Sequence, residues 1–148
     1  MFTIRPWLHV GKFVATLDVD MLHAHQIGAM LQLAESVQQT GIASRFVHVE
    51  DGEPLPAALL REGVDFVCLQ KSLGRNVLVA CGAGISRSAT FTVAALKEEE
   101  GLSLLKAFRE VKTKHPLAQP HPELWQSLCG YYGEQVPYTN LIQGFQTG

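Results

Sequence analysis

Residues 75–90 read RNVLVACGAGISRSAT, and this stretch decides the fold. Residues 77–80 are apolar and lie between two glycines, a pattern typical of a buried strand. Residues 88–100 contain no Pro or Gly, and Gly101 stands where the glycine of a helix C-cap is expected. The stretch therefore predicts a strand, a glycine-bearing loop and a helix, in that order.

This order directs a row of backbone N–H groups and the positive end of a helix dipole at one small volume. Cys81 stands at the mouth of the loop, where these groups stabilise a thiolate over a thiol. The same N–H groups can bind a phosphate dianion, and the guanidinium of Arg87 can reach two of its oxygens in a bidentate fork. A nucleophile, an anion cradle and an arginine so close together predict phosphoryl transfer through a cysteinyl-phosphate intermediate.

The loop closely resembles the signature of the cysteine-based protein tyrosine phosphatases, Cys-x5-Arg-Ser/Thr, and its second half resembles the dual-specificity branch in particular. The similarity covers about residues 4–133, and the chain looks like a small, atypical, single-domain member. It implies a nucleophile at Cys81 and a phosphate site formed by Gly82, Ala83, Gly84, Ile85, Ser86 and Arg87. Two other phosphate loops do not fit. Arg87 stands where a dinucleotide fingerprint needs a third glycine, and no lysine lies between residues 72 and 96 for a nucleotide-binding loop.

A general acid is expected on an acidic loop. Residues 44–49 alternate between polar and apolar, which predicts a strand, and they run into Glu50-Asp51-Gly52-Glu53-Pro54. Cleavage of a phosphate ester needs an acid that protonates the departing oxygen, and a carboxylic acid on a mobile loop suits this task. Asp51 lies about where the resemblance places the acid, with Glu50 and Glu53 as weaker candidates. The alternative is that these acids only keep a surface loop solvated.

Two further positions bear on the reaction. Ser88, in the first helical turn, can donate a hydrogen bond to the sulfur and ease its departure when the phospho-enzyme hydrolyses; it can equally be a simple helix-start serine. The family normally has a histidine directly before the nucleophile, where this chain has Ala80. That histidine helps to hold the loop and favours the thiolate, so we expect Cys81 to ionise less readily and the enzyme to be slower or active at higher pH.

The remaining elements follow from patterns and caps. We expect a strand or hairpin in residues 2–17, a short helix capped by Asp18, a strand over 29–34, a helix over 56–72 with a breach at Gly63, and helices after Ser103 and from Pro122. Lys112, Lys114 and His115 suit the C-terminal dipole of the Ser103 helix. The predicted fold is an α/β domain over residues 1–148. Its central sheet is mixed and largely parallel, with helices on both faces and the site at the carboxyl end of the strands. Residues 134–148 carry no recognisable motif.

Composition supports one globular domain: 148 residues, 47% hydrophobic, 18% charged, net charge −2. This charge gives no general attraction to nucleic acid or to an anionic membrane. Three cysteines, an odd number, and no apolar stretch of secretory type favour a cytoplasmic protein. Cys68 reads as a core residue, although it could form a protective disulfide with an oxidised Cys81.

The sequence therefore predicts a phosphomonoester phosphatase of dual-specificity type. We expect it to dephosphorylate phosphotyrosine, phosphoserine or phosphothreonine in a protein or peptide, with no metal and no cofactor. One alternative substrate is a phosphoinositide or another non-protein phosphate, although the loop has no basic residue between Cys81 and Arg87. A phosphate-binding pseudophosphatase is the other alternative, and Ala80 is the feature that favours it. No oligomeric state is indicated.

Overall fold

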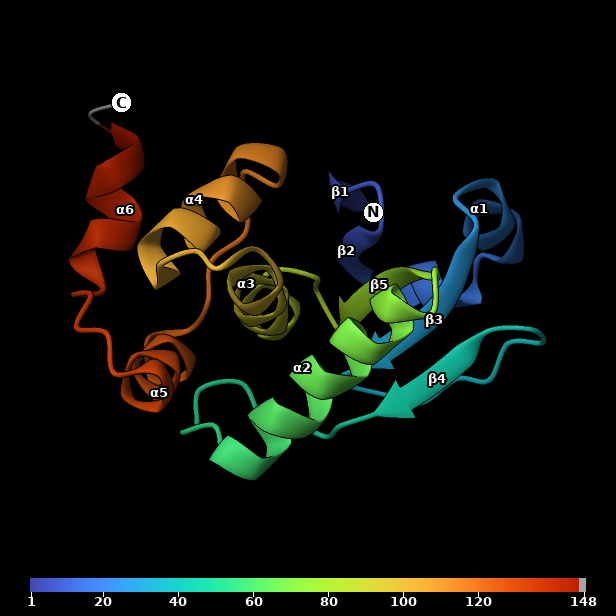
Figure 1. The fold of residues 1–148 in the computed structure, drawn as a ribbon, viewed down its shortest axis with the longest axis horizontal. Coiled ribbons are helices and arrows are strands. Elements are labelled where there is room, and N and C mark those ends of the chain that lie inside the picture. Colours follow the sequence, from blue (N-terminus) through green and yellow to red (C-terminus); the bar gives the residue numbers. More distant parts are fainter. Residues whose placement is uncertain (147–148) are drawn as a thin grey trace.

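The computed structural model describes residues 1–146, and within them the chain forms a mixed sheet with the strand order β1-β2-β5-β3-β4. Only the edge pair β1–β2 is antiparallel; the other neighbours run parallel (Figure 1). The strands are β1 (Phe2–Arg5), β2 (Leu8–Lys12), β3 (Ile27–Gln32), β4 (Ala43–Phe46) and β5 (Asn76–Cys81).

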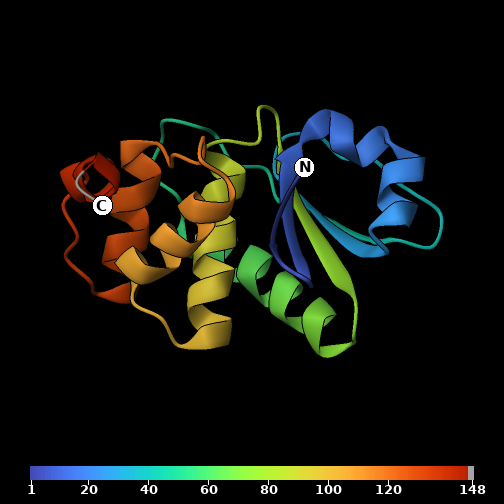
Figure 2. The ribbon, with the colours of Figure 1, turned by 90° about the horizontal axis from the view of Figure 1, so that it is seen from above.

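Helices cover both faces of this sheet, as Figures 1 and 2 show. A short 3-10 helix, η1, and α1 lie on one face, while α2 and α3 lie on the other and α4 and α5 pack against α3. The helices are η1 (Phe13–Leu17), α1 (Val19–Ala24), α2 (Ala57–Ser72), α3 (Arg87–Glu100), α4 (Leu104–Lys114), α5 (Pro122–Tyr132) and α6 (Thr139–Gln146). None of the helices in residues 1–146 has the length and apolarity needed to cross a bilayer. The predicted α/β class is confirmed.

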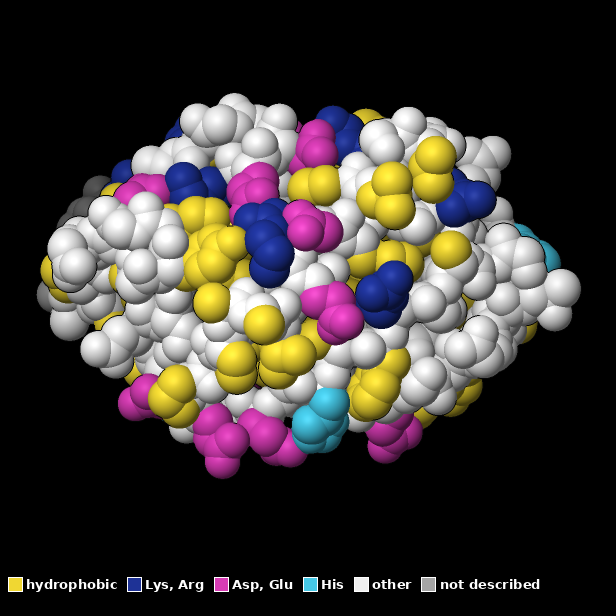
Figure 3. All heavy atoms as spheres, turned by 60° about the horizontal axis from the view of Figure 1, so that its bottom comes forward, with side chains coloured by type: hydrophobic (Ala, Val, Ile, Leu, Met, Phe, Trp, Pro, Cys, Tyr) yellow, Lys and Arg dark blue, Asp and Glu magenta, His cyan; other side chains and the backbone are white. Residues whose placement is uncertain are grey.

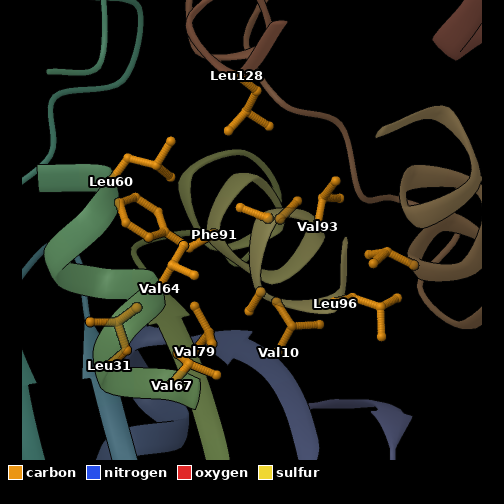
Figure 4. Packing of buried hydrophobic residues seen from close by; sticks show 14 of the residues in the cluster. Val10, Leu31, Leu60, Val64, Val67, Val79, Phe91, Val93, Leu96 and Leu128 are labelled. Atoms are coloured by element: carbon orange, nitrogen blue, oxygen red, sulfur yellow. The ribbon is translucent and has the colours of Figure 1, made fainter. Parts of the chain in front are cut away.

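The central strand β5 divides the core in two, because successive side chains of a strand point to opposite faces. Val79 and Cys81 belong to the larger apolar cluster, under α2 and α3, whereas Leu78 and Ala80 belong to the smaller cluster on the α1 side. Figure 4 shows Val79 and Phe91 pointing into the larger cluster. The sulfur of Cys81 therefore faces the helix that follows it in sequence.

Several of the predicted helix boundaries are confirmed, because local capping sets them, whereas the strand predicted over 29–34 begins and ends two residues earlier, as β3. The Asp18 side chain accepts a hydrogen bond from the Met21 amide at 3.1 Å, and the Ser103 hydroxyl accepts one from the Lys106 amide at 3.2 Å. Gly101 ends α3 in the left-handed conformation, with φ of 66°. Pro122 occupies the first turn of α5.

The predicted breach at Gly63 is wrong, since α2 runs unbroken from Ala57 to Ser72. A Cβ at this position would lie 2.4 Å from Cε1 of Phe91, so the glycine is required by helix packing and not by a break. The strand predicted over 44–49 is also too long. Regular β4 ends at Phe46, although the Val47 amide still donates to the Gln32 carbonyl of β3 at 2.9 Å. Helix α6 lies in the tail for which no motif was recognised.

We predict that Gly63→Ala destabilises the protein by about 1–3 kcal/mol, because the added methyl group must displace the buried Phe91 ring. Urea unfolding measures the change. Gly130→Ala is the matched control, since Gly130 also lies inside a helix, but apart from its own helix backbone no atom lies within 4 Å of its ideal Cβ. That control should be neutral or stabilising by up to about 1 kcal/mol. Equal effects of the two substitutions would contradict the packing argument.

Candidate active site

The sulfur of Cys81 lies at the N-terminus of α3. Cys81 is the last residue of β5, and α3 begins six residues later at Arg87. The Ser88 amide donates to Sγ at 3.3 Å, and the Ser88 hydroxyl oxygen lies 3.2 Å from the same sulfur. Both residues are buried, with exposures of 2% and 0%. A thiol thus lies in front of the positive end of a helix, within reach of a hydroxyl that can donate a hydrogen bond to it.

Three carbonyl groups of the loop between β5 and α3 are hydrogen-bonded to neighbouring elements. The Gly82 carbonyl accepts from the Phe13 amide at 3.3 Å, and the Ile85 carbonyl accepts from the Gln119 amide at 2.9 Å. The Gly84 carbonyl accepts from Nε2 of His115 at 2.7 Å. Because the C=O and N–H of a planar trans peptide point in opposite directions, these contacts direct the amides of the following residues away from the same neighbours.

Gly84 has to be a glycine for two reasons. Its φ is 70°, in the left-handed region that side chains disfavour. A Cβ there would also lie 2.8 Å from the Gly11 carbonyl carbon and 2.9 Å from the Lys12 nitrogen at the end of β2. The loop therefore lies directly against the neighbouring strand at this residue.

Arg87 connects the loop of residues 82–86, which we call the phosphate loop after its expected ligand, with the acidic loop of residues 50–54. Its Nη1 donates to the Val49 carbonyl at 3.0 Å, and its Nη2 lies 3.2 Å from the ideal Cβ position of Gly82. The guanidinium thus folds back over the start of the loop. The contact with the Val49 carbonyl uses only part of the guanidinium. Its other N–H donors remain for an anion bound in the loop between β5 and α3.

Asp51 is the carboxylate of the acidic loop that the structure places against the phosphate loop. Its Oδ1 accepts from the Ser86 hydroxyl at 2.7 Å, and the Ser86 oxygen itself accepts from the His121 amide at 2.9 Å. The Asp51 side chain is also exposed to solvent. Glu50 instead pairs with His48 at 2.5 Å. Glu53 lines a small pocket with His48 and Leu55.

The other cysteines lie away from this site, and all three are free thiols. Burial and the neighbouring Glu99 raise the pKa of Cys68 to about 12. Glu99 and Ser88 are eleven residues apart on α3, which corresponds to about 16 Å along a helix. Cys68 is therefore too far from Cys81 for the disulfide considered above.

Sequence reasoning missed the contacts that hold the loop from outside. His115 was assigned to the dipole of α4, but its ring is 2% exposed and bonds to the Gly84 carbonyl. Burial, first, and the nearby Lys112 lower the pKa of His115, which is the opposite of what a dipole-stabilised cation would show. Ser86 was assigned only to phosphate binding, and its contact with Asp51 joins segments 35 residues apart.

The Arg61 guanidinium is paired with acidic side chains. Arg61 of α2 forms ion pairs with Asp65 at 2.8 Å and with Glu98 at 2.6 Å. On the face shown in Figure 3, Lys and Arg side chains lie among Asp and Glu side chains and form no continuous basic patch. Within residues 1–146 there is also no group of three His, Cys, Asp or Glu residues arranged to hold a metal ion.

Comparisons with known proteins all point to the same family. The family model described as "Dual specificity phosphatase, catalytic domain" matches residues 8–134. Dual specificity protein phosphatase 15 of Mus musculus is 31% identical over 131 residues, which is 86% of this chain and 56% of the relative. Dual specificity protein phosphatase 1 of Arabidopsis thaliana is 32% identical over 122 residues, 80% of this chain and 62% of the relative.

A solved structure, that of human DUSP28, superposes with a TM-score of 0.84 at 28% identity and covers 90% of this chain and 96% of that chain. The crystal structure of DUSP15 superposes with a TM-score of 0.80, also at 28% identity, over 96% of this chain and 95% of that chain. Of the two curated relatives named above, the phosphatases of Mus musculus and Arabidopsis thaliana, the chain spans about six tenths of the length.

We predict that the fold loses stability as the pH falls from about 6.5 to 5. Burial is the first cause that lowers the pKa of His9 and of His115, so the unfolded chain takes up protons near pH 6.5 while the folded protein does not. The contribution of both residues is complete above pH 6.5 and is lost on acidification. The lowered pKa values of Glu100 and Glu134 act in a lower window, below about pH 4.5.

The urea midpoint at pH 8, 7, 6 and 5 measures this dependence. The double substitution of His9→Gln and His115→Gln should flatten the curve, whereas His23→Gln on the exposed side of α1 should not. An equally steep fall in the double variant and in the parent would show that other groups are responsible.

Proposed function

Since the chain belongs to the dual-specificity phosphatase family, we propose that it hydrolyses phosphomonoesters on protein or peptide side chains through a cysteinyl-phosphate intermediate. The observation that carries the proposal is the joint placement of Cys81, Arg87 and Asp51 around one loop. Ser88 contacts the sulfur, and two residues earlier Ser86 holds the Asp51 carboxylate at 2.7 Å. We propose residues 1–148 as one catalytic domain.

In the first step the Cys81 thiolate attacks phosphorus. An S–P bond forms and the P–O bond to the substrate breaks. The departing oxygen takes its proton from the Asp51 carboxylic acid. Asp51 is suited to this role because it is exposed and faces the loop, whereas Glu50 is engaged with His48.

In the second step a water molecule attacks the cysteinyl phosphate. Asp51, now a carboxylate, accepts a proton from the water, an O–P bond forms and the S–P bond breaks, which releases inorganic phosphate. The returning thiolate is stabilised by the Ser88 hydroxyl and amide, which lie 3.2 and 3.3 Å from Sγ. After phosphate is released, the enzyme has returned to its starting state.

Arg87 and the amides of residues 82–87 stabilise the equatorial oxygens in both transition states. Donors that are already oriented stabilise developing charge without reorganisation, which is the largest single source of rate enhancement in many enzymes. The two glycines let the backbone approach the oxygens closely, and Gly84 adopts a conformation that other residues avoid.

A phosphorylated side chain fits this site better than a polyanionic headgroup. The loop residues Gly82, Ala83, Ile85 and Ser86 carry no cation, and the Asp51 carboxylate lies against the loop through the Ser86 hydroxyl. The Asp51 carboxylate would repel the additional charges of a ligand with several phosphates. The proposed substrates are therefore phosphotyrosine, phosphoserine and phosphothreonine residues.

We predict that the reduced protein releases phosphate from an aryl phosphate in the presence of a chelator. Cys81→Ser should lower the rate by roughly 10³-fold or more, because it removes the nucleophile. Asp51→Asn should lower it by roughly 10²-fold and remove the high-pH limb of the rate profile, because that limb reports loss of the acid's proton. Initial rates between pH 5 and 9 measure both effects.

The matched controls are Cys129→Ser and Asp65→Asn, a buried thiol and an exposed carboxylate away from the site. Both should retain the parental rate profile. A parent protein that releases no phosphate but binds vanadate or a phosphopeptide would contradict the enzyme proposal and favour a phosphate-binding pseudophosphatase. Activity that survives Cys81→Ser would overturn the mechanism.

We predict that Ser88→Ala slows the second step more than the first, because the hydroxyl stabilises the sulfur as it departs. Rapid mixing of the variant with an aryl phosphate should show a burst of the phenol. The steady-state rate that follows should be roughly tenfold lower than that of the parent, as expected from the loss of one hydrogen bond to a charged group. Ser72→Ala on the exposed end of α2 is the control and should show no burst. A Ser88→Ala variant without a burst would place the slow step elsewhere.

A further inference from the structure

The loop that surrounds Cys81 depends on contacts from other elements for its shape. Its Gly82 and Ile85 carbonyls accept hydrogen bonds from backbone amides, those of Phe13 and Gln119. The Gly84 carbonyl differs, because it accepts from a side chain, that of His115, at 2.7 Å. Substitution can remove this donor without breaking the backbone, so its contribution can be measured by itself.

The environment of His115 fixes the orientation of its ring and which ring nitrogen carries the proton. A carbonyl can only accept, so Nε2 carries the proton and Nδ1 does not. Nδ1 is buried and has no hydrogen-bond partner within residues 1–146, so the bond from Nε2 to the Gly84 carbonyl is the hydrogen bond that orients the ring. The ring stacks on Phe2 with the centroids 3.9 Å apart and the planes at 19°.

The backbone of His115 is held as firmly as its ring. Its amide donates to the Val111 carbonyl at 2.8 Å, and its carbonyl accepts from the Ala118 amide at 2.9 Å. Burial lowers the pKa of the imidazole more than the hydrogen bond to the Gly84 carbonyl raises it, and Lys112 and the N-terminal ammonium group lower it further. The result is a neutral, fixed N–H donor that faces the outer side of the phosphate loop.

The peptide between Gly84 and Ile85 is the one that most needs such a donor. Gly84 has no side chain and a φ of 70°, and glycine passes between left-handed and other conformations at little cost. If this peptide turned over, a carbonyl oxygen would face the anion where an N–H group is required. The exchange would replace an attraction for phosphate with a repulsion.

We propose that His115 is a positioning residue that holds the Gly84–Ile85 peptide with its carbonyl outward and its N–H toward the phosphate. This proposal rests on the proposed function, because it assigns the loop to phosphate binding. It also accounts for how the loop is held where Ala80 replaces the usual histidine: Ala80 faces the cluster on the α1 side and has no donor. His115 approaches from α4, on a different side of the loop.

Two substitutions separate the donor from the ring. His115→Phe keeps an aromatic ring against Phe2 but removes the N–H, whereas His115→Gln removes the ring but places an amide N–H near the position of Nε2. For each variant we would measure kcat and KM for an aryl phosphate, the dissociation constant of tungstate, and the pH dependence of Cys81 alkylation by iodoacetamide. Urea unfolding of each variant reports stability separately.

We expect His115→Phe to weaken tungstate binding and lower kcat/KM by about tenfold, and to shift the alkylation midpoint to higher pH. His115→Gln should stay within about threefold of the parent in all three measurements, even if its stability falls. Tungstate affinity that is unchanged in His115→Phe would overturn the proposal. So would His115→Gln being as impaired as His115→Phe, because the ring and not the donor would then matter.

A measurement on the parent protein covers the case in which a variant does not fold. The ¹⁵N resonances of the His115 ring should report a proton on Nε2 and none on Nδ1 at pH 7; the opposite tautomer would overturn the proposal. The proposed function fails separately. A parent that binds tungstate but hydrolyses no ester would end the enzyme proposal, while a loss of tungstate binding in His115→Phe would still support the positioning role.

Discussion

The structure depends on one constraint, which is that both ends of the phosphate loop are fixed in the most buried parts of the protein. β5 is the middle strand of the sheet, and its residues from Val77 to Cys81 are buried. The first turns of α3 are buried as well, from Ser88 to Leu96. A strand and a helix that are both surrounded by core cannot move independently, so the loop between them spans a constant gap. Donors on such a loop are oriented before a ligand arrives, which is what electrostatic catalysis requires.

Fixed ends still leave the peptides between them free to rotate, and the surrounding elements limit this rotation. The first turn of η1 holds the Gly82 carbonyl, and the segment between α4 and α5 holds the Ile85 carbonyl through Gln119. The end of β2 lies within 3 Å of where a Cβ of Gly84 would be, so the loop is pressed against the sheet. The elements that form the core therefore also shape the site, and a substitution that loosens the core can lower activity without touching a reacting atom.

Local signals made much of this predictable. The strand 76–81, helix α3, the caps at Asp18 and Ser103 and the first-turn proline Pro122 are set by residues close in sequence, and so is the loop that contains Cys81 and Arg87. The contacts that were missed join distant segments. Gly63 looks like a helix breaker until the Phe91 ring is placed beside it, and His115 looks like a helix-end cation until the Gly84 carbonyl lies 2.7 Å from its ring. A pattern along the chain reports which face a residue occupies, but not which atom of another element it meets there.

Two consecutive residues hold the acidic loop against the phosphate loop by hydrogen bonds. Arg87 binds the Val49 carbonyl and Ser86 binds the Asp51 carboxylate, so the chain on both sides of Glu50 is held by the segment that enters α3. In the proposed reaction this matters because the acid and the nucleophile act on opposite ends of one breaking bond, and a small misplacement of either is costly. A general acid on an exposed loop would otherwise be the least ordered member of the site. Here the hydrogen bonds from Ser86 and Arg87 hold Asp51 in place relative to the start of α3, which in the proposed reaction supplies the arginine that binds the phosphate.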